Sequence, residues 1–308
     1  MTNRSTSSSL TKYYWERASR NRLAVAGLVF ILFLVLLALI GPFFTTDPTA
    51  VNFEEKNQPP LGFTIEESVY NLETQQLITK SIIGTKQHPL GTDNKGRDLL
   101  AMIISGARVS LMVGLLATGI AVALGTLIGT TSAYFGGWVD QVIMRFTDIM
   151  MTFPFFLLFV LIVFIYGPSL IIIVVVIGLT GWTGTARLIR SETLSLKTRE
   201  FIMASKALGA SNSRIILAHL VPNVISLIIV IATLSIPGVI LAEAALSFIG
   251  LGDPLVTSWG MVLRTGQQNL DIAWWVAVAP GVMLFLTVLA FNFMGDGLRD
   301  AFDPRSAV

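Results

Sequence analysis

Long apolar stretches recur along this sequence and leave few kinds of fold open to it. Each approaches the length of about 20 residues that a helix needs to cross the hydrocarbon core of a bilayer. Unpaired backbone groups are costly in lipid, so each stretch is expected to be helical. Six spans are predicted, at residues 22–44, 105–131, 139–166, 169–186, 222–246 and 274–294. The predicted fold class is an all-α integral membrane protein with six transmembrane helices.

Composition supports this class and excludes several functions. Charged residues make up 13% of the 308 residues and hydrophobic residues 53%, whereas soluble domains are about a quarter charged. The absence of cysteine excludes disulfides, thiolate metal sites and a cysteine nucleophile. The two histidines, His88 and His219, are far apart in sequence, which disfavours a histidine-rich metal site.

Basic residues predict the orientation of the chain, because lysine and arginine favour cytoplasmic loops. They are concentrated in residues 1–22 and between the fourth and fifth spans, whereas the connection from the fifth to the sixth span holds only Arg264. The N- and C-termini are therefore expected in the cytoplasm of a multi-pass protein of the plasma or inner membrane. The first apolar stretch is interpreted as an uncleaved span, since no small-residue cleavage pattern closes it.

These spans divide the chain into four regions. We predict a cytoplasmic tail (1–21), a first span with a long extracellular loop (22–104), a five-helix core (105–299) that contains a cytoplasmic coupling loop (199–223), and a C-terminal tail (300–308). No role is assigned to residues 51–86.

The end of the long loop, "HPLGTDNKGRDLLAMIISGAR", carries turn-forming glycines beside two aspartates. This pattern predicts a turn that leads into a short helix at the membrane surface, as a structured lid over the start of the second span. A calcium site at Asp93, Asn94 and Asp98 is the alternative, although no complete EF-hand loop is present.

One polar segment, "EFIMASKALGASNSRIILAHLVPN" (Glu200–Asn223), interrupts the apolar pattern. Glycine adopts the left-handed conformation that ends many helices, so Gly209 is expected to follow a first helix. Ser211 or Ser213 can cap a second helix. The helical period gives the first helix one face made of Phe201, Ala204, Ala207 and Leu208, and gives the second an apolar face made of Ile215, Ile216 and Leu220, before Pro222 stops the segment or opens the next span.

Periodicity alone leaves two interpretations of this helix–turn–helix open. The pair can lie on the membrane surface as amphipathic helices. It can also insert into the groove of a cytoplasmic partner.

The segment resembles the EAA signature of importer-type ABC transporter permeases. The matching positions, together with their neighbours in the segment, are Glu200, Phe201, Ala204, Ser205, Ala207, Leu208, Gly209, Ala210, Ile215, Ile216 and Pro222. Ser205 stands where alanine is usual, and Val221 where leucine is usual. In that family the loop docks onto the ATP-hydrolysing subunit, so the resemblance favours docking over the membrane-surface interpretation.

Further stretches, among them "HPLGTDNKGRDLL", "RFTDIMMTFP" and "LAEAALSFIGLG", resemble the C-type subunit of the dipeptide/oligopeptide permease subfamily. The resemblance implies a type I ABC importer permease fold and half of a translocation pathway for peptides. It also implies partners: a related B-type permease subunit in a heterodimer, two ATP-binding subunits that hold ATP and Mg²⁺, an extracellular substrate-binding protein and the lipid bilayer, with no nucleic acid. Nickel or a nickel chelate is the alternative cargo within the same subfamily.

The chain itself is not expected to be an enzyme or to hold a cofactor or metal. It lacks the G-x-x-x-x-G-K-[S/T] loop that cradles phosphates, and it shows no catalytic set of nucleophile and base. A proton-driven transporter is a further alternative, with Glu243 and Asp148 as relay groups.

Ionisable residues inside apolar stretches are costly and call for an interpretation. Arg145 and Asp148 are three residues apart, a spacing that allows a structural ion pair on one helix. Alternatively, Asp148 lines the translocation path or a gate. For Glu243 the alternatives are a hydrogen bond to backbone at the break near Gly250 and Gly252, or a position in the central cavity.

Small residues predict three features of the packing. Gly125 and Gly129 form a GxxxG pattern that allows close helix contact. Pro237-Gly238 predicts a kink or break in the fifth span. Ser258–Gln268 is expected to form an outer surface or re-entrant helix, which the resemblance would place under the docked binding protein.

Overall fold

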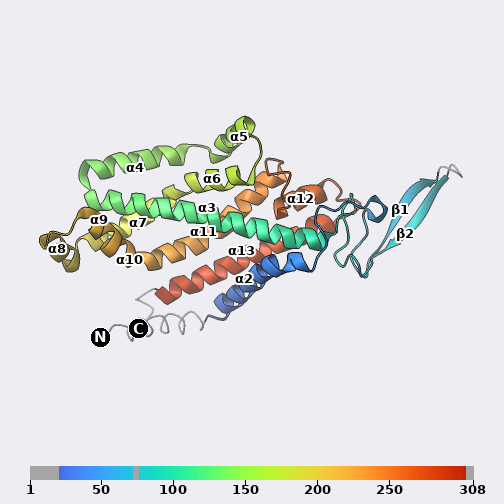
Figure 1. Ribbon diagram of the computed structural model, residues 1–308, viewed down its shortest axis with the longest axis horizontal. Helices are drawn as coiled ribbons and strands as arrows, with labels where there is room; N and C mark the ends of the chain where they lie inside the picture. Colours follow the sequence, from blue (N-terminus) through green and yellow to red (C-terminus); the bar gives the residue numbers. More distant parts are fainter. Residues whose placement is uncertain (1–20, 72–75, 303–308) are drawn as a thin grey trace. The chain divides into compact units, whose positions relative to one another are not determined.

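The computed structural model describes residues 21–71 and 76–302, and helices dominate these residues (Figure 1). The longer helices are α2 (Arg22–Ile40), α3 (Leu99–Phe135), α4 (Gly137–Thr152), α5 (Phe155–Tyr166), α6 (Leu170–Thr180), α7 (Trp182–Lys197), α8 (Glu200–Ala207), α11 (Ile225–Phe248), α12 (Trp259–Gln267) and α13 (Trp275–Phe302). Short elements are η1 (Gly41–Phe43), η2 (Phe53–Glu55), α9 (Asn212–Arg214), η3 (Ile215–Leu220, a π-helix) and α10 (Val221–Asn223).

Five helical segments among the described residues are long and apolar enough to cross a membrane. They are Arg22–Phe43, Leu99–Phe135, Leu170–Lys197, Ile225–Phe248 and Trp275–Phe302. The predicted third span instead consists of two helices, α4 and α5, that meet at an angle of 77°. Pro154 lies at the break as the N-cap of α5, because proline has no N–H for an intrahelical hydrogen bond. The predicted third span is therefore not one continuous helix, and it counts as a sixth span only if the bent pair crosses the membrane together.

Two spans continue beyond their predicted ends. Helix α3 begins six residues before the predicted start at Ser105, and the fourth span extends through α7 to Lys197. The added turns of α7 are rich in polar and charged residues, so a search for apolar stretches does not detect them. In the fifth span, α11 continues through Pro237, so of the predicted kink or break the break does not occur.

The contacts divide the described chain into two compact units, each considered separately. One unit comprises residues 21–31, 113–239 and 288–302, and the other comprises residues 32–112 and 240–287. The divisions fall within α2, α3, α11 and α13.

The first unit contains close contacts between helices at glycine positions. A Cβ atom at Gly125 would lie 2.6 Å from Cβ of Thr185 on α7. One at Gly129 would overlap the backbone carbonyl of Ala186. The predicted role of the GxxxG pattern in packing is therefore confirmed.

The second unit contains a β-hairpin that the sequence did not predict. Strands β1 (Thr64–Asn71) and β2 (Gln76–Ile83) are antiparallel, with Thr64 paired to Ile83. The hairpin projects from the loop between α2 and α3 (Figure 1).

Two indole groups fasten the loops and helices of this second unit. Trp259 is fully buried and donates from Nε1 to the carbonyl oxygen of Ile103 at 3.0 Å. Trp275 donates to the carbonyl oxygen of Thr92 at 3.0 Å. Trp259 begins α12, so the helix predicted at residues 258–268 is confirmed and is anchored to α3.

Candidate functional site

The polar segment at residues 200–223 folds as a helix, a glycine turn and a second helix. Gly209 has φ +80°. Its N–H donates to the carbonyl of Lys206, and the N–H of Ala210 donates to that of Ser205. These two bonds form a Schellman motif, which satisfies carbonyls that the end of α8 leaves unpaired. The Ser211 side chain caps α9 by accepting from the N–H of Arg214, so Ser211, and not Ser213, is the cap among the two predicted.

One side of this segment packs into the first unit. Ile215, Ile216 and Leu220 are buried in a cluster with Ile189 and Leu196 of α7. The buried residue of α8 is Ile202, which the sequence analysis did not single out. The sequence indicates the burial of Ile202 only weakly, because a single large residue on the inner face of a short helix produces no helical period.

One polar contact joins the segment to the end of α3, and a second joins the preceding helix, α7, to the same end. The Tyr134 hydroxyl donates to Oδ1 of Asn212 at 2.7 Å. Nζ of Lys197 donates to the carbonyl of Ala133 at 3.2 Å. The segment is therefore held by its second helix and by the preceding helix.

The other side of α8 remains exposed and apolar. The predicted face of Phe201, Ala204, Ala207 and Leu208 is solvent-accessible, and Leu208 is 88% exposed. Exposed apolar residues that gather on one element indicate an interaction surface. Glu200 begins the helix, where a carboxylate favours the helix dipole. The geometry suits either a membrane surface or a protein groove.

Helices α4 and α7 are joined by two ion pairs in the first unit. Arg190 binds both carboxylate oxygens of Asp140, at 2.6 and 2.5 Å, and the Ser132 hydroxyl also donates to Asp140. Arg187 binds Asp148 at 2.5 Å. The predicted pairing of Asp148 with Arg145 was wrong, because α7 supplies a closer arginine. Arg145 is exposed, and no ion pair of it is seen within the described part of the chain.

These two ion pairs give a graded prediction. The side chains of Asp140 and Arg190 are 15% and 31% exposed, whereas those of Asp148 and Arg187 are 51% and 46% exposed. Asp140→Asn should lower the free energy of unfolding by about 1–2 kcal/mol, because it leaves a half-buried arginine without its carboxylate. Asp148→Asn should cost about 0.5 kcal/mol or less. Thermal unfolding of the purified variants in one detergent measures both, and equal losses would contradict the ranking.

Glu243 lies on α11 and is fully buried in the second unit. The Ser247 hydroxyl donates to Oε1 at 2.7 Å, and the Ser110 hydroxyl donates to Oε2 at 3.3 Å. The hydroxyl of Ser258 is a third polar group at this carboxylate. One of the two alternatives for Glu243 was a hydrogen bond to backbone near Gly250, but hydroxyls from three separate segments take this role. The sequence alone does not identify these hydroxyl partners of Glu243, since Ser110 and Glu243 are 133 residues apart.

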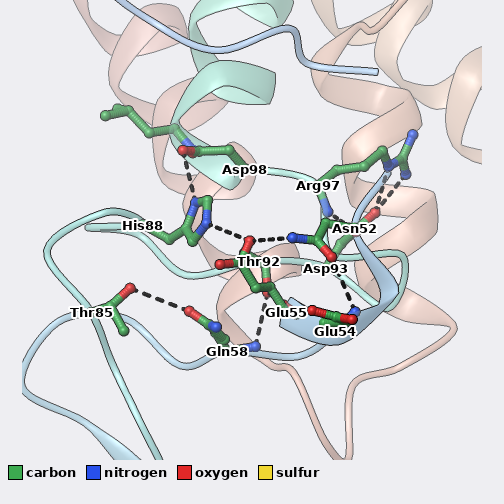
Figure 2. A network of polar contacts seen from close by, with 11 residues as sticks. Asn52, Glu54, Glu55, Gln58, Thr85, His88, Thr92, Asp93, Arg97 and Asp98 are labelled. Atoms are coloured by element: carbon green, nitrogen blue, oxygen red, sulfur yellow. Dashed lines mark hydrogen bonds and ion pairs between the residues drawn. The ribbon is translucent and has the colours of Figure 1, made fainter. Parts of the chain in front are cut away.

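The end of the long loop forms a polar network around His88 (Figure 2). Its Nδ1 lies 3.0 Å from Asp98 and its Nε2 lies 3.2 Å from Glu55. Asp98 also caps α3 by accepting from the N–H of Leu100. The histidine thus joins η2 to Asp98 at the start of α3, so this part of the loop is structured, while its role as a lid stays a prediction. The turn is as predicted, but it leads directly into α3 rather than into a separate short helix.

The carboxylates proposed for calcium have other partners in this network. Asp93 is fully buried and binds the guanidinium of Arg97 at 2.7 and 2.6 Å. It also accepts from the N–H groups of Lys95 and Arg97. These contacts give Asp93 a structural role in closing the turn (Figure 2).

Comparison with known families gives two matches. The family described as "Binding-protein-dependent transport system inner membrane component" matches residues 121–308. The one described as "N-terminal TM domain of oligopeptide transport permease C" matches residues 9–60.

Individual relatives match nearly the whole chain. The oligopeptide transport system permease protein OppC of Haemophilus influenzae is 38% identical over 94% of this chain and 87% of the relative. The dipeptide transport system permease protein DppC of Bacillus subtilis is 37% identical over 96% of this chain and 86% of the relative. OppC of Escherichia coli is 38% identical over 94% and 91%.

A solved structure shares the fold. A chain of the MetNI methionine ABC transporter, in an inward-facing conformation, aligns with a TM-score of 0.53. The alignment covers 66% of this chain and 97% of that chain at 18% identity. The likeness therefore concerns the fold alone, and it agrees with the type I importer permease fold expected from the sequence.

Proposed function

Because the chain belongs to the family of binding-protein-dependent transport system inner membrane components, we propose that it is the C-type permease subunit of an ATP-driven peptide importer. One observation carries the choice of cargo. Three relatives named as oligopeptide or dipeptide permeases each align with at least 94% of this chain at 37–38% identity. The chain supplies half of a translocation pathway, and a related B-type permease supplies the other half.

The energy for transport enters through the coupling loop (199–223), of which residues 200–223 form the helix–turn–helix. Its exposed face, Phe201, Ala204, Ala207 and Leu208, docks into a groove of an ATP-binding subunit. The proposal is supported by the packing of its second helix against α7, because a firmly held loop transmits a push to the spans. ATP and Mg²⁺ bind to the two partner subunits, and this chain holds no cofactor of its own.

The docking direction requires the coupling loop and both termini to face the cytoplasm. The distribution of lysine and arginine supports this orientation. The long loop with the β-hairpin then faces the substrate-binding protein on the outside. Closure of the ATP-binding subunits draws the coupling loops together and opens the pathway outward, and hydrolysis returns it to the inward-facing state.

Three charged residues are candidates for the pathway or its gate in this mechanism. Asp148 and Arg145 are both exposed on α4, three residues apart, and Asp148 is paired with Arg187 of α7. An exposed carboxylate in a span suits a water-filled path shared with the partner permease. Glu243 is enclosed by hydroxyls in this chain, so a role in the pathway requires the outward-open state to uncover it.

Uptake in cells with and without the gene tests the proposal. We expect labelled di- to pentapeptides to enter only cells that carry the gene and its partner subunits, with dependence on ATP and without competition from nickel. Dissipating the proton gradient at constant ATP should leave uptake unchanged, which separates this mechanism from a proton-driven one. If cells without the gene lose nickel accumulation but take up peptides normally, the cargo is nickel. The proposed coupling to ATP-binding subunits would then still stand.

A further inference from the structure

A hollow of about 440 Å³ lies in the second unit, where the end of α2 meets the first turns of α3. Its walls combine apolar side chains, Pro42 and Ile104, with hydroxyls and two opposite charges, Asp47 and Arg108. The two segments that form it are closely packed, since a Cβ at Gly41 would lie 2.5 Å from Cγ2 of Ile104. The hollow therefore belongs to ordered parts of the structure and has one cation and one anion on its walls.

Both charges are available to a ligand. Arg108 is exposed, and its guanidinium has no hydrogen bond or ion pair within residues 21–71 and 76–302. Asp47 accepts from the Thr49 hydroxyl at 2.6 Å and from the Thr49 N–H at 2.8 Å, both at Oδ1. These bonds lower the pKa of Asp47, chiefly through the hydroxyl. Its Oδ2 takes part in neither of them.

The lengths of the two neighbouring helices allow the hollow to lie at the depth of lipid headgroups. Helix α3 has 37 residues, which at about 1.5 Å per residue is far longer than the hydrocarbon core of about 30 Å. Its first turns, including Arg108, can therefore project beyond the hydrocarbon. The first candidate span ends at Phe43, directly beside Thr45 and Asp47 of the hollow.

Exposed apolar residues precede Thr45 of the hollow in sequence, in α2 and around η1. Phe43 and Phe44 are 85% and 83% exposed. Leu32, Leu36 and Leu39 of α2 are also exposed. Surface of this kind on a spanning helix is covered by acyl chains. An amphipathic ligand could therefore place a charged head in the hollow and an apolar tail against the exposed apolar residues near it.

We propose that this hollow binds the headgroup of a zwitterionic phospholipid, phosphatidylethanolamine. The Arg108 guanidinium and the Ser105 hydroxyl hold the phosphate, while Oδ2 of Asp47 accepts a hydrogen bond from the ammonium. Guanidinium and phosphate match in geometry, and charge-assisted bonds are the stronger class. The acyl chains lie beside Phe43 and Phe44. Binding of this lipid joins the end of the first span to α3.

Native mass spectrometry of the purified, delipidated full-length chain tests the site. The probes are phosphatidylethanolamine, phosphatidylglycerol and phosphatidylcholine with identical acyl chains. We expect one tightly held phosphatidylethanolamine, retained about tenfold better than the other two, because phosphatidylglycerol lacks the ammonium and phosphatidylcholine lacks its N–H donors. Equal retention of the three lipids would overturn the proposal.

Two variants separate the roles of the charges. Arg108→Gln should lower the retention of phosphatidylethanolamine about tenfold, because the contact with the phosphate is lost. Asp47 lies on an exposed loop, so Asp47→Asn is not expected to disturb folding. It should remove the preference for phosphatidylethanolamine over phosphatidylglycerol, while phosphatidylglycerol still binds. Lys86→Gln, which removes an exposed charge from the same unit outside the hollow, is the control and should change neither value.

A peptide also carries an ammonium and an anionic group, so it is the competing source of this chemistry. Adding a zwitterionic dipeptide at millimolar concentration should leave the bound lipid in place. Displacement of the lipid by the dipeptide would assign the hollow to cargo and overturn the lipid site. An Arg108→Gln chain that binds all three lipids as the unaltered chain does would also overturn it. These readouts do not depend on transport, so they are independent of the uptake test.

Discussion

Replacing Gly209 with valine should abolish peptide uptake while the chain still reaches the membrane. Gly209 has φ +80°, and a β-branched residue in this left-handed region costs about 1–2 kcal/mol. A Cβ at this position meets no atom within 4 Å, so the backbone alone carries the penalty. The native turn is then disfavoured by about tenfold, and Phe201 and Leu208 are presented to the ATP-binding subunit at the wrong angle. ATP-dependent uptake in whole cells, normalised to the amount of chain in the membrane, measures the loss.

Gly209→Asn is the matched control for this variant. Asparagine also adds a side chain in open space, but it tolerates the left-handed conformation. We expect it to retain most of the uptake. Normal uptake by Gly209→Val would show that the turn does not govern coupling. A fall in membrane-inserted chain equal to the fall in uptake would attribute the loss to folding instead.

Replacing Gly129 with valine should lower the free energy of unfolding by about 3 kcal/mol, the upper end of the range for overpacking and the largest stability effect expected here. A Cβ at Gly129 would overlap the carbonyl oxygen of Ala186 and lie 3.1 Å from the backbone nitrogen of Arg190. Backbone atoms cannot rotate away as a flexible side chain does, so α3 and α7 must separate. Overpacking of this kind costs about 1–3 kcal/mol or more. Thermal unfolding of the purified chain in detergent measures it.

Gly119 on the same helix provides the control. A Cβ there meets nothing within 4 Å. Gly119→Val makes the same chemical change in α3, so the intrinsic helix preference of valine cancels between the two variants. We expect it to unfold within about 1 kcal/mol of the unaltered chain. Similar losses from both variants would contradict the assignment of Gly129 to the contact with α7.

The coupling loop separates what local sequence predicts from what it does not. The end of α8 at Gly209, the cap at Ser211 and the apolar face of the second helix depend on neighbours within a few residues, and all three are as predicted. The burial of Ile202, by contrast, was not predicted. It lies in one buried cluster with Ile215 and Leu220 of the second helix. That choice depends on how the second helix folds back, so helical period alone does not select Ile202 over Phe201 as the buried residue.

The charged residues show the same division. Spacing along α4 allowed Asp148 to meet Arg145, yet the structure pairs it with Arg187, 39 residues away. Glu243 likewise takes its partners from α3, α11 and the start of α12. A buried carboxylate needs partners, and the sequence therefore predicts that they exist. Their identity depends on which helices lie side by side.

The sequence by itself determined the membrane class, the number of apolar segments and the helix–turn–helix of the coupling loop. Each follows from composition, from runs of about 20 apolar residues or from local backbone preferences. Only the tertiary structure decided the strand pairing of the β-hairpin in the long loop and the network around His88. These features depend on contacts between residues that are distant in sequence. A pattern read over a few neighbouring residues contains no information about those contacts.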